Sequence, residues 1–265
     1  MTPVHGTIPT APRRVVRHVE HVMGMPISLA LRGRHAEDAA GRDAWHIALG
    51  ELRGVDEVFS TYRPDSVISR LGRGEITEAD CPPEVAEVLA LAARAERASD
   101  GAFSAVRPGP DGTRVLDPSG VVKGWAVERS ATALGELDET DFCLSAGGDM
   151  LARALDPHLP WRIGLEDPHD TSRVLGVVPL TDGAVATSGT AHRGGHIIDA
   201  RTGRAPVGVA SVTVVARSLT WADIDATVAY AHGPGAATWL GQRVGRTGLV
   251  VWADGSTTTV TRTTP

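Results

Sequence analysis

The fold class is decided by five short apolar runs: DFCLSA (141–146), WRIGLE (161–166), VLGVVPL (174–180), GAVATS (183–188) and SVTVVA (211–216). Each has the length and composition of a strand, and glycine, proline or aspartate lies between them. Helical segments do not alternate with them regularly, as a doubly wound parallel sheet would require. The stretch therefore favours an α+β fold with mixed or antiparallel sheets and flanking helices.

The segments on either side of these runs complete the predicted order of elements. Residues 14–32 read as two strands broken between Met23 and Pro26, and a closing hairpin over 248–262 turns at Asp254-Gly255. Apolar spacing predicts a helix over about 35–59, and Pro82-Pro83 opens a second one that ends before Gly101. Three further helices are predicted over 119–135, 221–232 and 235–245.

Composition excludes several classes of protein. The chain has 265 residues, a net charge of −6 and a hydrophobic fraction of 42%, which suits one large domain or two intimately packed lobes. We expect residues 1–13 to form a flexible arm and residues 14–265 a single domain. The sequence contains no membrane segment, secretory signal or lipobox, so a cytoplasmic protein without a nucleic-acid partner is expected. Cys81 and Cys143 are far apart and predict free thiols.

Lys123 is the only lysine among 26 basic residues, and it lies in DPSGVVKGWAVER (117–129). A loop there enters a helix, so backbone amides and the Lys123 ammonium suit a phosphate group, with Asp117 at the start of the segment. The GxxxxGK[ST] spacing of a nucleotide P-loop is absent. The alternative interpretation is that Lys123 has no functional role and is a lysine retained by chance.

Four other segments carry glycine, hydroxyl and acidic groups that a core does not need. They are FSTYRPDSVISRLG (59–72) with Tyr62, SDGAFSA (99–105) with Ala102 and Phe103, SAGGDM (145–150) with Gly147, Gly148 and Asp149, and residues 186–206 with Thr187, Ser188, Gly189, His196 and Asp199. The Tyr62 ring could stack on a flat ligand, and His196 could act as a base with Asp199 as its orienter. Packing residues and tight turns are the simpler interpretation of each segment.

Asp223 and Thr227 are four residues apart on a predicted helix and therefore share a face. A carboxylate and a hydroxyl suit a hard cation such as Mg2+, and we expect Asp223 to be a surface carboxylate. An acid that interacts with the helix dipole is the alternative. No His/Cys spacing predicts a zinc site.

The sequence resembles the ApbE-type flavin transferase family over about residues 20–232. The matching motifs occur in the family's order: Met23-Gly24, FSTYRPDSVISRL, DGAF, DxxGxxKGWA, SAGGD, DP in GLEDP, VATSG, HIIDxRTG and WADIDAT. The resemblance implies an ApbE-like α+β fold. It also implies FAD as substrate and Mg2+-dependent transfer of FMN from FAD to a threonine hydroxyl of an acceptor protein, with release of AMP.

The resemblance also implies a role for each motif. Asp223, Thr227 and the carbonyl of Val122 would hold the metal, and Tyr62 would stack on the flavin. The residues themselves, and not the resemblance, make Lys123, His196 and Asp199 the catalytic candidates, with His196 taking the proton of the acceptor threonine; Lys123 and His196 would also line the FAD site. The rest of the flavin and pyrophosphate site would be formed by Met23, Ala102, Phe103, Asp117, Gly147, Gly148, Asp149, Thr187, Ser188 and Gly189.

The chain departs from the family pattern at a few loop and rim positions: FSAV at 103–106, Ala200, Gly72 and Glu128, where the family commonly has FDPT, Pro, Asn and Asp. These departures concern the flavin contacts more than the metal site. Two other functions stay open at this point. One is an FAD pyrophosphatase that gives FMN and AMP, and the other is a non-catalytic FAD-binding protein.

Overall fold

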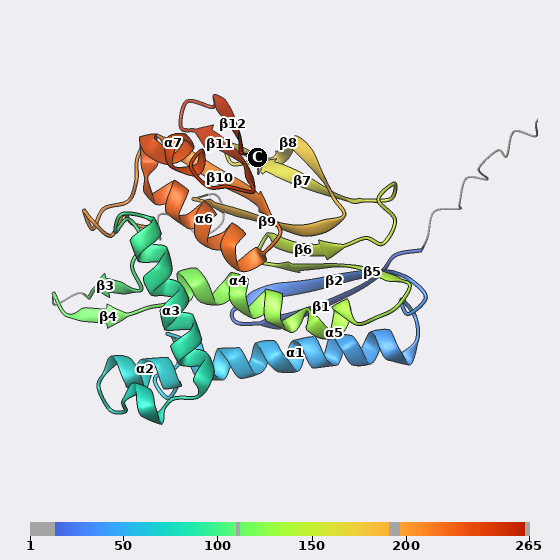
Figure 1. Cartoon of the computed structure of the whole chain (residues 1–265), viewed down its shortest axis with the longest axis horizontal. Coiled ribbons are helices and arrows are strands. Elements are labelled where there is room, and N and C mark those ends of the chain that lie inside the picture. Colours follow the sequence, from blue (N-terminus) through green and yellow to red (C-terminus); the bar gives the residue numbers. More distant parts are fainter. Residues whose placement is uncertain (1–13, 110–111, 191–196, 263–265) are drawn as a thin grey trace, which may run out of the picture.

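An eight-stranded antiparallel sheet forms the centre of the structure, a computed structural model that describes residues 14–109, 112–190 and 197–262. Its strand order is β1-β2-β5-β6-β9-β10-β11-β12 (Figure 1). The strands are β1 (Val16–Val22), β2 (Met25–Gly33), β5 (Thr140–Ala146), β6 (Asp149–Arg153), β9 (Asp182–Gly189), β10 (Val209–Ala216), β11 (Arg246–Trp252) and β12 (Thr257–Arg262). Every neighbouring pair is antiparallel, so the predicted α+β class is confirmed.

The helices follow the predicted order, with two differences in extent. They are α1 (Ala39–Phe59), α2 (Val67–Gly72), α3 (Pro83–Ala98), α4 (Ser119–Ser130), α5 (Thr132–Gly135), α6 (Leu219–Ala231) and α7 (Ala236–Leu240). The predicted helix over 119–135 is two helices that separate at Ala131. The predicted helix over 235–245 is wrong in extent, since α7 ends at Leu240 and Gly245 adopts a positive φ of 71°.

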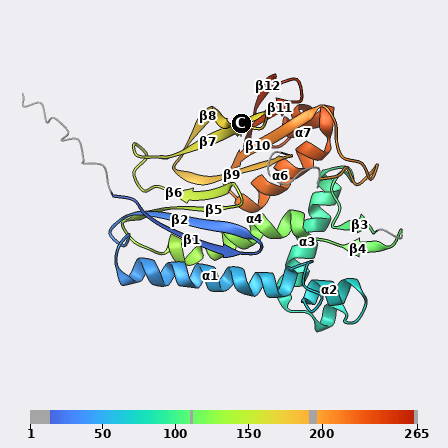
Figure 2. The same ribbon diagram turned by 180° about the vertical axis from the view of Figure 1, so that it is seen from behind.

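The two faces of the sheet are covered differently. Ile27, Leu29 and Leu31 alternate along β2 and pack with α1, α4 and α6 in the main hydrophobic core. On the other face, the hairpin of β7 (Trp161–Asp167) and β8 (Asp170–Leu180) packs through Ile163 and Leu180 against Ala152 and Val185. In Figures 1 and 2, the β7–β8 hairpin accordingly lies on the side of the sheet away from α1 and α4.

A smaller group of elements lies beside the sheet. It contains α2, the lower part of α3 and the short hairpin of β3 (Val106–Pro108) and β4 (Arg114–Leu116) (Figure 2). Gly72 at the end of α2 packs close to Leu116 of β4. The predicted arm over residues 1–13 lies outside the described residues, and so does His196.

Three connections meet at one end of the sheet. The β1–β2 turn contains Met23 at φ 55°, and the β5–β6 turn contains Gly147 and Gly148 at φ 56° and 97°. Gly147 N donates to Pro26 O at 3.3 Å and so places these two turns side by side. Because β9 ends at Gly189 and pairs antiparallel with β6, its last residues lie at this same end. The topology therefore brings three of the predicted site segments together.

Candidate functional site

Lys123 joins three elements through two buried carboxylates. Its Nζ lies 2.5 Å from Asp149 Oδ2, at the start of β6, and 3.1 Å from Asp223 Oδ1 on α6. The Asp149 and Asp223 side chains are 1% and 4% exposed, and that of Lys123 is 18% exposed. The three residues were singled out separately in the sequence, and the structure brings them together.

Burial and charge act against each other in this cluster. Burial alone would lower the pKa of Lys123, but the charges of Asp223 and Asp149 raise it above its ordinary value. Burial raises the pKa of Asp223 to about 7, with a further contribution from Asp149 and opposition from Lys123. One ammonium between two carboxylates leaves a net negative charge in a buried place, which favours an added cation.

The expectation that Asp223 is a surface carboxylate is wrong. Its residue exposure is only 2%, because α6 is apolar on nearly all sides and packs between α4 and the sheet. Gly124 N donates to Asp223 Oδ2 at 3.0 Å, so both carboxylate oxygens have partners on α4. A first-turn acid that only interacts with the helix dipole would not be held in this way.

Hydroxyl groups lie next to the carboxylates. Thr227, one turn beyond Asp223 on α6, has its Oγ1 3.1 Å from Ser188 Oγ on β9. Thr187 N donates to Asp149 Oδ1 at 3.0 Å, which ties β9 to the same cluster. Val122 is buried in α4 directly before Lys123. Carboxylate, hydroxyl and carbonyl oxygens of this kind form the donor set that suits Mg2+.

Within the described ranges, no three His, Cys, Asp or Glu side chains are grouped to hold a metal ion. A cation at this cluster would therefore take at most two protein carboxylates. Neutral oxygens, water and ligand phosphate would supply the rest, which is how Mg2+ is usually held.

The loop that follows the undescribed segment contacts a second predicted segment. Ala200 N donates to Ala102 O at 3.0 Å, so the HIIDxRTG and DGAF motifs lie side by side. Asp199 accepts from Arg201 N, Nε and Nη2, each at 2.9 Å, and the Arg201 side chain lowers the pKa of Asp199. Among the residues that the structure describes, Arg201 is thus the side-chain partner of Asp199.

Three predicted flavin contacts have different surroundings. Tyr62 is 96% exposed on the turn after α1, so no packing role accounts for its ring. Phe103 is 7% exposed and packs so closely on Gly120 that a Cβ there would lie 2.7 Å from Phe103 Cε2, which is a core contact. Asp117 accepts from Arg107 Nε at 2.8 Å and from Ser119 N at 3.2 Å.

Gly124 allows α4 and α6 to approach closely. A Cβ there would lie 2.8 Å from Leu219 O and 2.9 Å from Asp223 Cβ. We expect Gly124→Ala to force α6 away and to lower the free energy of unfolding by about 1 to 3 kcal/mol, as overpacking does. Urea unfolding measures this. Gly50→Ala in α1 is the matched control, because nothing lies within 4 Å of its Cβ and helix propensity alone should stabilise it. An equal change in the free energy of unfolding for the two variants would contradict the close approach of α4 and α6.

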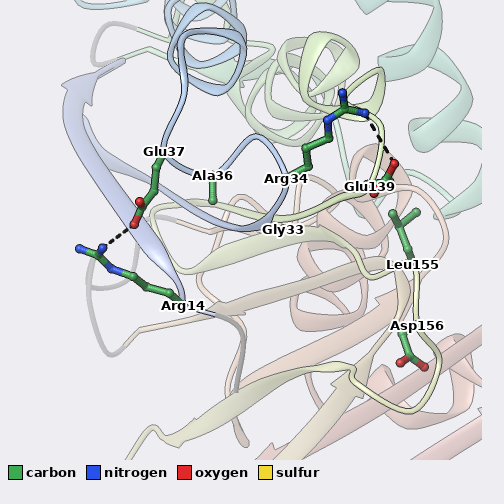
Figure 3. A pocket seen from close by; sticks show the side chains of 8 residues that line it. All are labelled: Arg14, Gly33, Arg34, Ala36, Glu37, Glu139, Leu155 and Asp156. Atoms are coloured by element: carbon green, nitrogen blue, oxygen red, sulfur yellow. Dashed lines mark ion pairs between the residues drawn. The ribbon is translucent and has the colours of Figure 1, made fainter. Parts of the chain in front are cut away.

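A cavity of about 770 Å3 lies at the opposite end of the sheet, where β2 ends (Figure 3). Its walls carry the ion pairs Arg14–Glu37 at 2.6 Å and Arg34–Glu139 at 3.6 Å. None of the predicted site residues within the described ranges lines it. Over the part of the chain that the structure describes, no helix is long and apolar enough to span a bilayer.

A family model described as the ApbE family matches residues 23–108 and 109–249. The chain therefore belongs to the ApbE family, and the resemblance seen in the sequence is confirmed.

Curated relatives carry the name FAD:protein FMN transferase. The relative from Vibrio cholerae is 36% identical over 120 residues, which are 41% of this chain and 36% of the relative. The one from Rhodobacter capsulatus is 34% identical over 163 residues, or 56% of this chain and 31% of the relative. The chain thus matches about a third of the length of these two relatives.

Two solved structures share the fold almost end to end. The ApbE protein of Thermotoga maritima has a TM-score of 0.79 at 20% identity, with 93% of this chain and 97% of that chain covered. The flavin transferase ApbE of Vibrio cholerae has a TM-score of 0.78 at 23% identity, with 94% and 98% covered. At these identities the likeness establishes the ApbE fold of the chain.

Proposed function

We propose that this protein transfers FMN from FAD to a threonine hydroxyl of an acceptor protein in a Mg2+-dependent reaction that releases AMP. The observation that carries the proposal is the buried cluster of Lys123, Asp149 and Asp223, at the end of the sheet where the glycine turns meet. The name of the curated relatives, FAD:protein FMN transferase, supports the transfer of FMN from FAD to a protein.

Asp223 and Thr227 would hold the metal, together with the carbonyl of Val122. Mg2+ bound here would neutralise charge on the pyrophosphate of FAD while the phosphorus–oxygen bond to AMP breaks. Lys123 would stay between the Asp149 and Asp223 carboxylates, and it would add positive charge beside the phosphates.

FAD would lie over the turns at this end of the sheet. Gly147 and Gly148 are exposed and have no side chain that would keep a phosphate from the backbone of this turn. Thr187, Ser188 and Gly189 would line the same site from β9, and Met23 from the β1–β2 turn. Ala102, Phe103 and Asp117 would shape its border, in part from the core side.

The acceptor threonine would approach the phosphorus of the FMN half from the side opposite AMP. Its hydroxyl proton must be removed as the new phosphorus–oxygen bond forms. We propose His196 as the base. Asp199, which is held by Arg201, would act as the orienter of His196.

The reaction is tested by incubation with FAD, Mg2+ and a protein that carries a flavinylation-type threonine, followed by mass spectrometry. The expected result is an FMN adduct on the threonine with one AMP released per adduct, and no adduct in EDTA. Free FMN and AMP without an adduct would instead identify an FAD pyrophosphatase. FAD binding without turnover would identify a binding protein.

Tyr62→Ala is expected to weaken FAD binding by about 1 to 3 kcal/mol, as the loss of a stacked ring does on nucleic-acid bases. The melting temperature should not change, because the side chain is 96% exposed and supports no core contact. Fluorescence titration with FAD measures the affinity, and Tyr62→Phe, which keeps the ring, is the control. An unchanged FAD affinity in the alanine variant would remove Tyr62 from the site.

A further inference from the structure

Glu128 on α4 receives three hydrogen bonds from the first turn of α6. Its Oε2 accepts from Ser218 Oγ at 2.8 Å, from Thr220 N at 2.8 Å and from Thr220 Oγ1 at 2.6 Å. Three donors on one oxygen make a strong, charge-assisted attachment. In the sequence, Glu128 stood out only as a departure from the family pattern.

The carboxylate lies where the α6 backbone needs an acceptor. Ser218 is the N-cap of α6, and its Oγ accepts from Trp221 N at 3.3 Å. Thr220 N is among the first amides of the helix, which have no acceptor within it. The negative charge of Glu128 also complements the positive end of the helix dipole. Glu128 therefore caps α6 from a neighbouring helix.

The attachment fixes the position of α6 along α4. Gly124 and Glu128 are one turn apart on α4, and Thr220 and Asp223 are one turn apart on α6. Gly124 N bonds to Asp223, while Glu128 bonds to Thr220. Two contacts one turn apart resist both sliding and rotation of α6. Asp223 is thereby held against Lys123.

We propose that Glu128 is a positioning residue for the metal-binding side chains: by holding the first turn of α6, it places Asp223 against Lys123 and Thr227 beside Ser188. Glu128 contacts none of these three residues through its three hydrogen bonds and acts through Ser218 and Thr220. The inference rests on the proposed function for the role of Asp223 and Thr227. It concerns this chain's own helix contact and not the identity of the acceptor.

Two variants separate the charge of Glu128 from its reach. Glu128→Gln keeps the length but loses the charge and turns one acceptor oxygen into a donor group. Glu128→Asp keeps the charge but shortens the side chain by one methylene. A cavity of about 400 Å3, lined by Glu128, Ser218 and Thr220 together with Trp125 and Trp221, leaves room for both side chains without a clash.

The experiment measures metal binding directly. Mn2+ is used as the probe and followed by electron paramagnetic resonance, with and without FAD. The Mg2+ concentration for half-maximal FMN transfer is measured in parallel. We expect Glu128→Gln to weaken Mn2+ binding and to raise the Mg2+ requirement by about tenfold, or 1.4 kcal/mol. Glu128→Asp should lie between Glu128→Gln and the wild type.

A matched variant controls for a general loss of stability. Ile163→Val thins the separate cluster between the β7–β8 hairpin and the sheet, far from α4. It should lower the melting temperature without changing the Mn2+ affinity. The double variant Glu128→Gln/Thr220→Val should lose less Mn2+ binding free energy than the sum of the losses in the two single variants, because both substitutions remove the same contact.

Wild-type metal affinity in Glu128→Gln would overturn the inference. The inference would also be overturned if Ile163→Val lowered the melting temperature as much as Glu128→Gln does and lost the same Mn2+ affinity. If the wild-type protein bound Mn2+ but transferred no FMN, the proposed function would fail. The Mn2+ comparison among the variants would still decide the role of Glu128.

Discussion

Asp223→Asn is expected to lower FMN transfer by roughly 10²- to 10³-fold, the loss seen when a group that stabilises transition-state charge is removed. Asparagine fits the space of the aspartate, which matters because Asp223 is only 2% exposed. Alanine would instead leave a cavity, while Lys123 kept only Asp149 as its carboxylate partner. Transfer is measured by mass spectrometry at saturating FAD and increasing Mg2+.

Thr227→Val is the milder companion to this variant. Valine keeps the shape of threonine but loses the hydroxyl that lies 3.1 Å from Ser188 Oγ. We expect it to raise the Mg2+ requirement with a smaller effect on the maximal rate. An unchanged Mg2+ titration would make Thr227 structural, and near-normal transfer by Asp223→Asn would remove the metal site from α6.

The raised pKa of Asp223 predicts that the stability of the wild type depends on pH in a way that the stability of Asp223→Asn does not. Burial lifts the pKa to about 7 in the folded protein, above its ordinary value of 3.8, so the folded state binds the proton more tightly than the unfolded state. The contribution of Asp223 to stability is then present below about pH 4 and is lost as pH rises through about 7. In EDTA, the free energy of unfolding of the wild type should fall between about pH 4 and pH 7 relative to that of Asp223→Asn. A difference in free energy of unfolding between the two proteins that does not change with pH would contradict the raised pKa of Asp223.

Much of the site could be predicted because its chemistry is concentrated in short segments. The only lysine of the chain, the SAGGD turn and the Asp223–Thr227 pair each stood out from the sequence. Their meeting could not be derived from local pattern, since Gly124 and Asp223 are 99 residues apart and are joined by the packing of α4 on α6. Only the order of family motifs indicated that these segments belong to one site.

The structure differs from the sequence predictions at a few positions, and at most of them tertiary packing, which a local sequence pattern does not contain, is the reason. Asp223 reads as a surface acid on a helix, but α6 is enclosed on nearly all sides, so even its polar groups are buried. In the sequence, Glu128 looks like an ordinary charged residue of an amphipathic helix. Its role depends on hydrogen-bond donors at Ser218 and Thr220, which lie 90 and 92 residues later in the chain. Helix α7 ends at Leu240, where Gly241 follows it and the chain then turns at Gly245, which adopts a positive φ.

Lys123→Met tests the buried cluster itself. Methionine has a similar length but no charge, so Asp149 and Asp223 would face each other without a cation. We expect the free energy of unfolding in EDTA to fall by about 3 to 5 kcal/mol, the usual cost of removing one partner from a buried ion pair. Urea unfolding measures this loss. Mg2+ should restore part of it, because the metal would supply the missing positive charge.

Lys123→Arg separates charge from shape. Arginine keeps the positive charge, so we expect most of the stability to remain, and the chain already uses arginine at 25 of its 26 basic positions. The ammonium of Lys123, however, fits between Asp149 Oδ2 and Asp223 Oδ1, beside the tight Gly124 contact with α6. The broader guanidinium would displace one carboxylate from the metal position, and transfer should fall at least tenfold, or about 1.4 kcal/mol. If Lys123→Arg matched the wild type in rate and Mg2+ requirement, the shape of the lysine would be irrelevant, and only its charge would matter at this site.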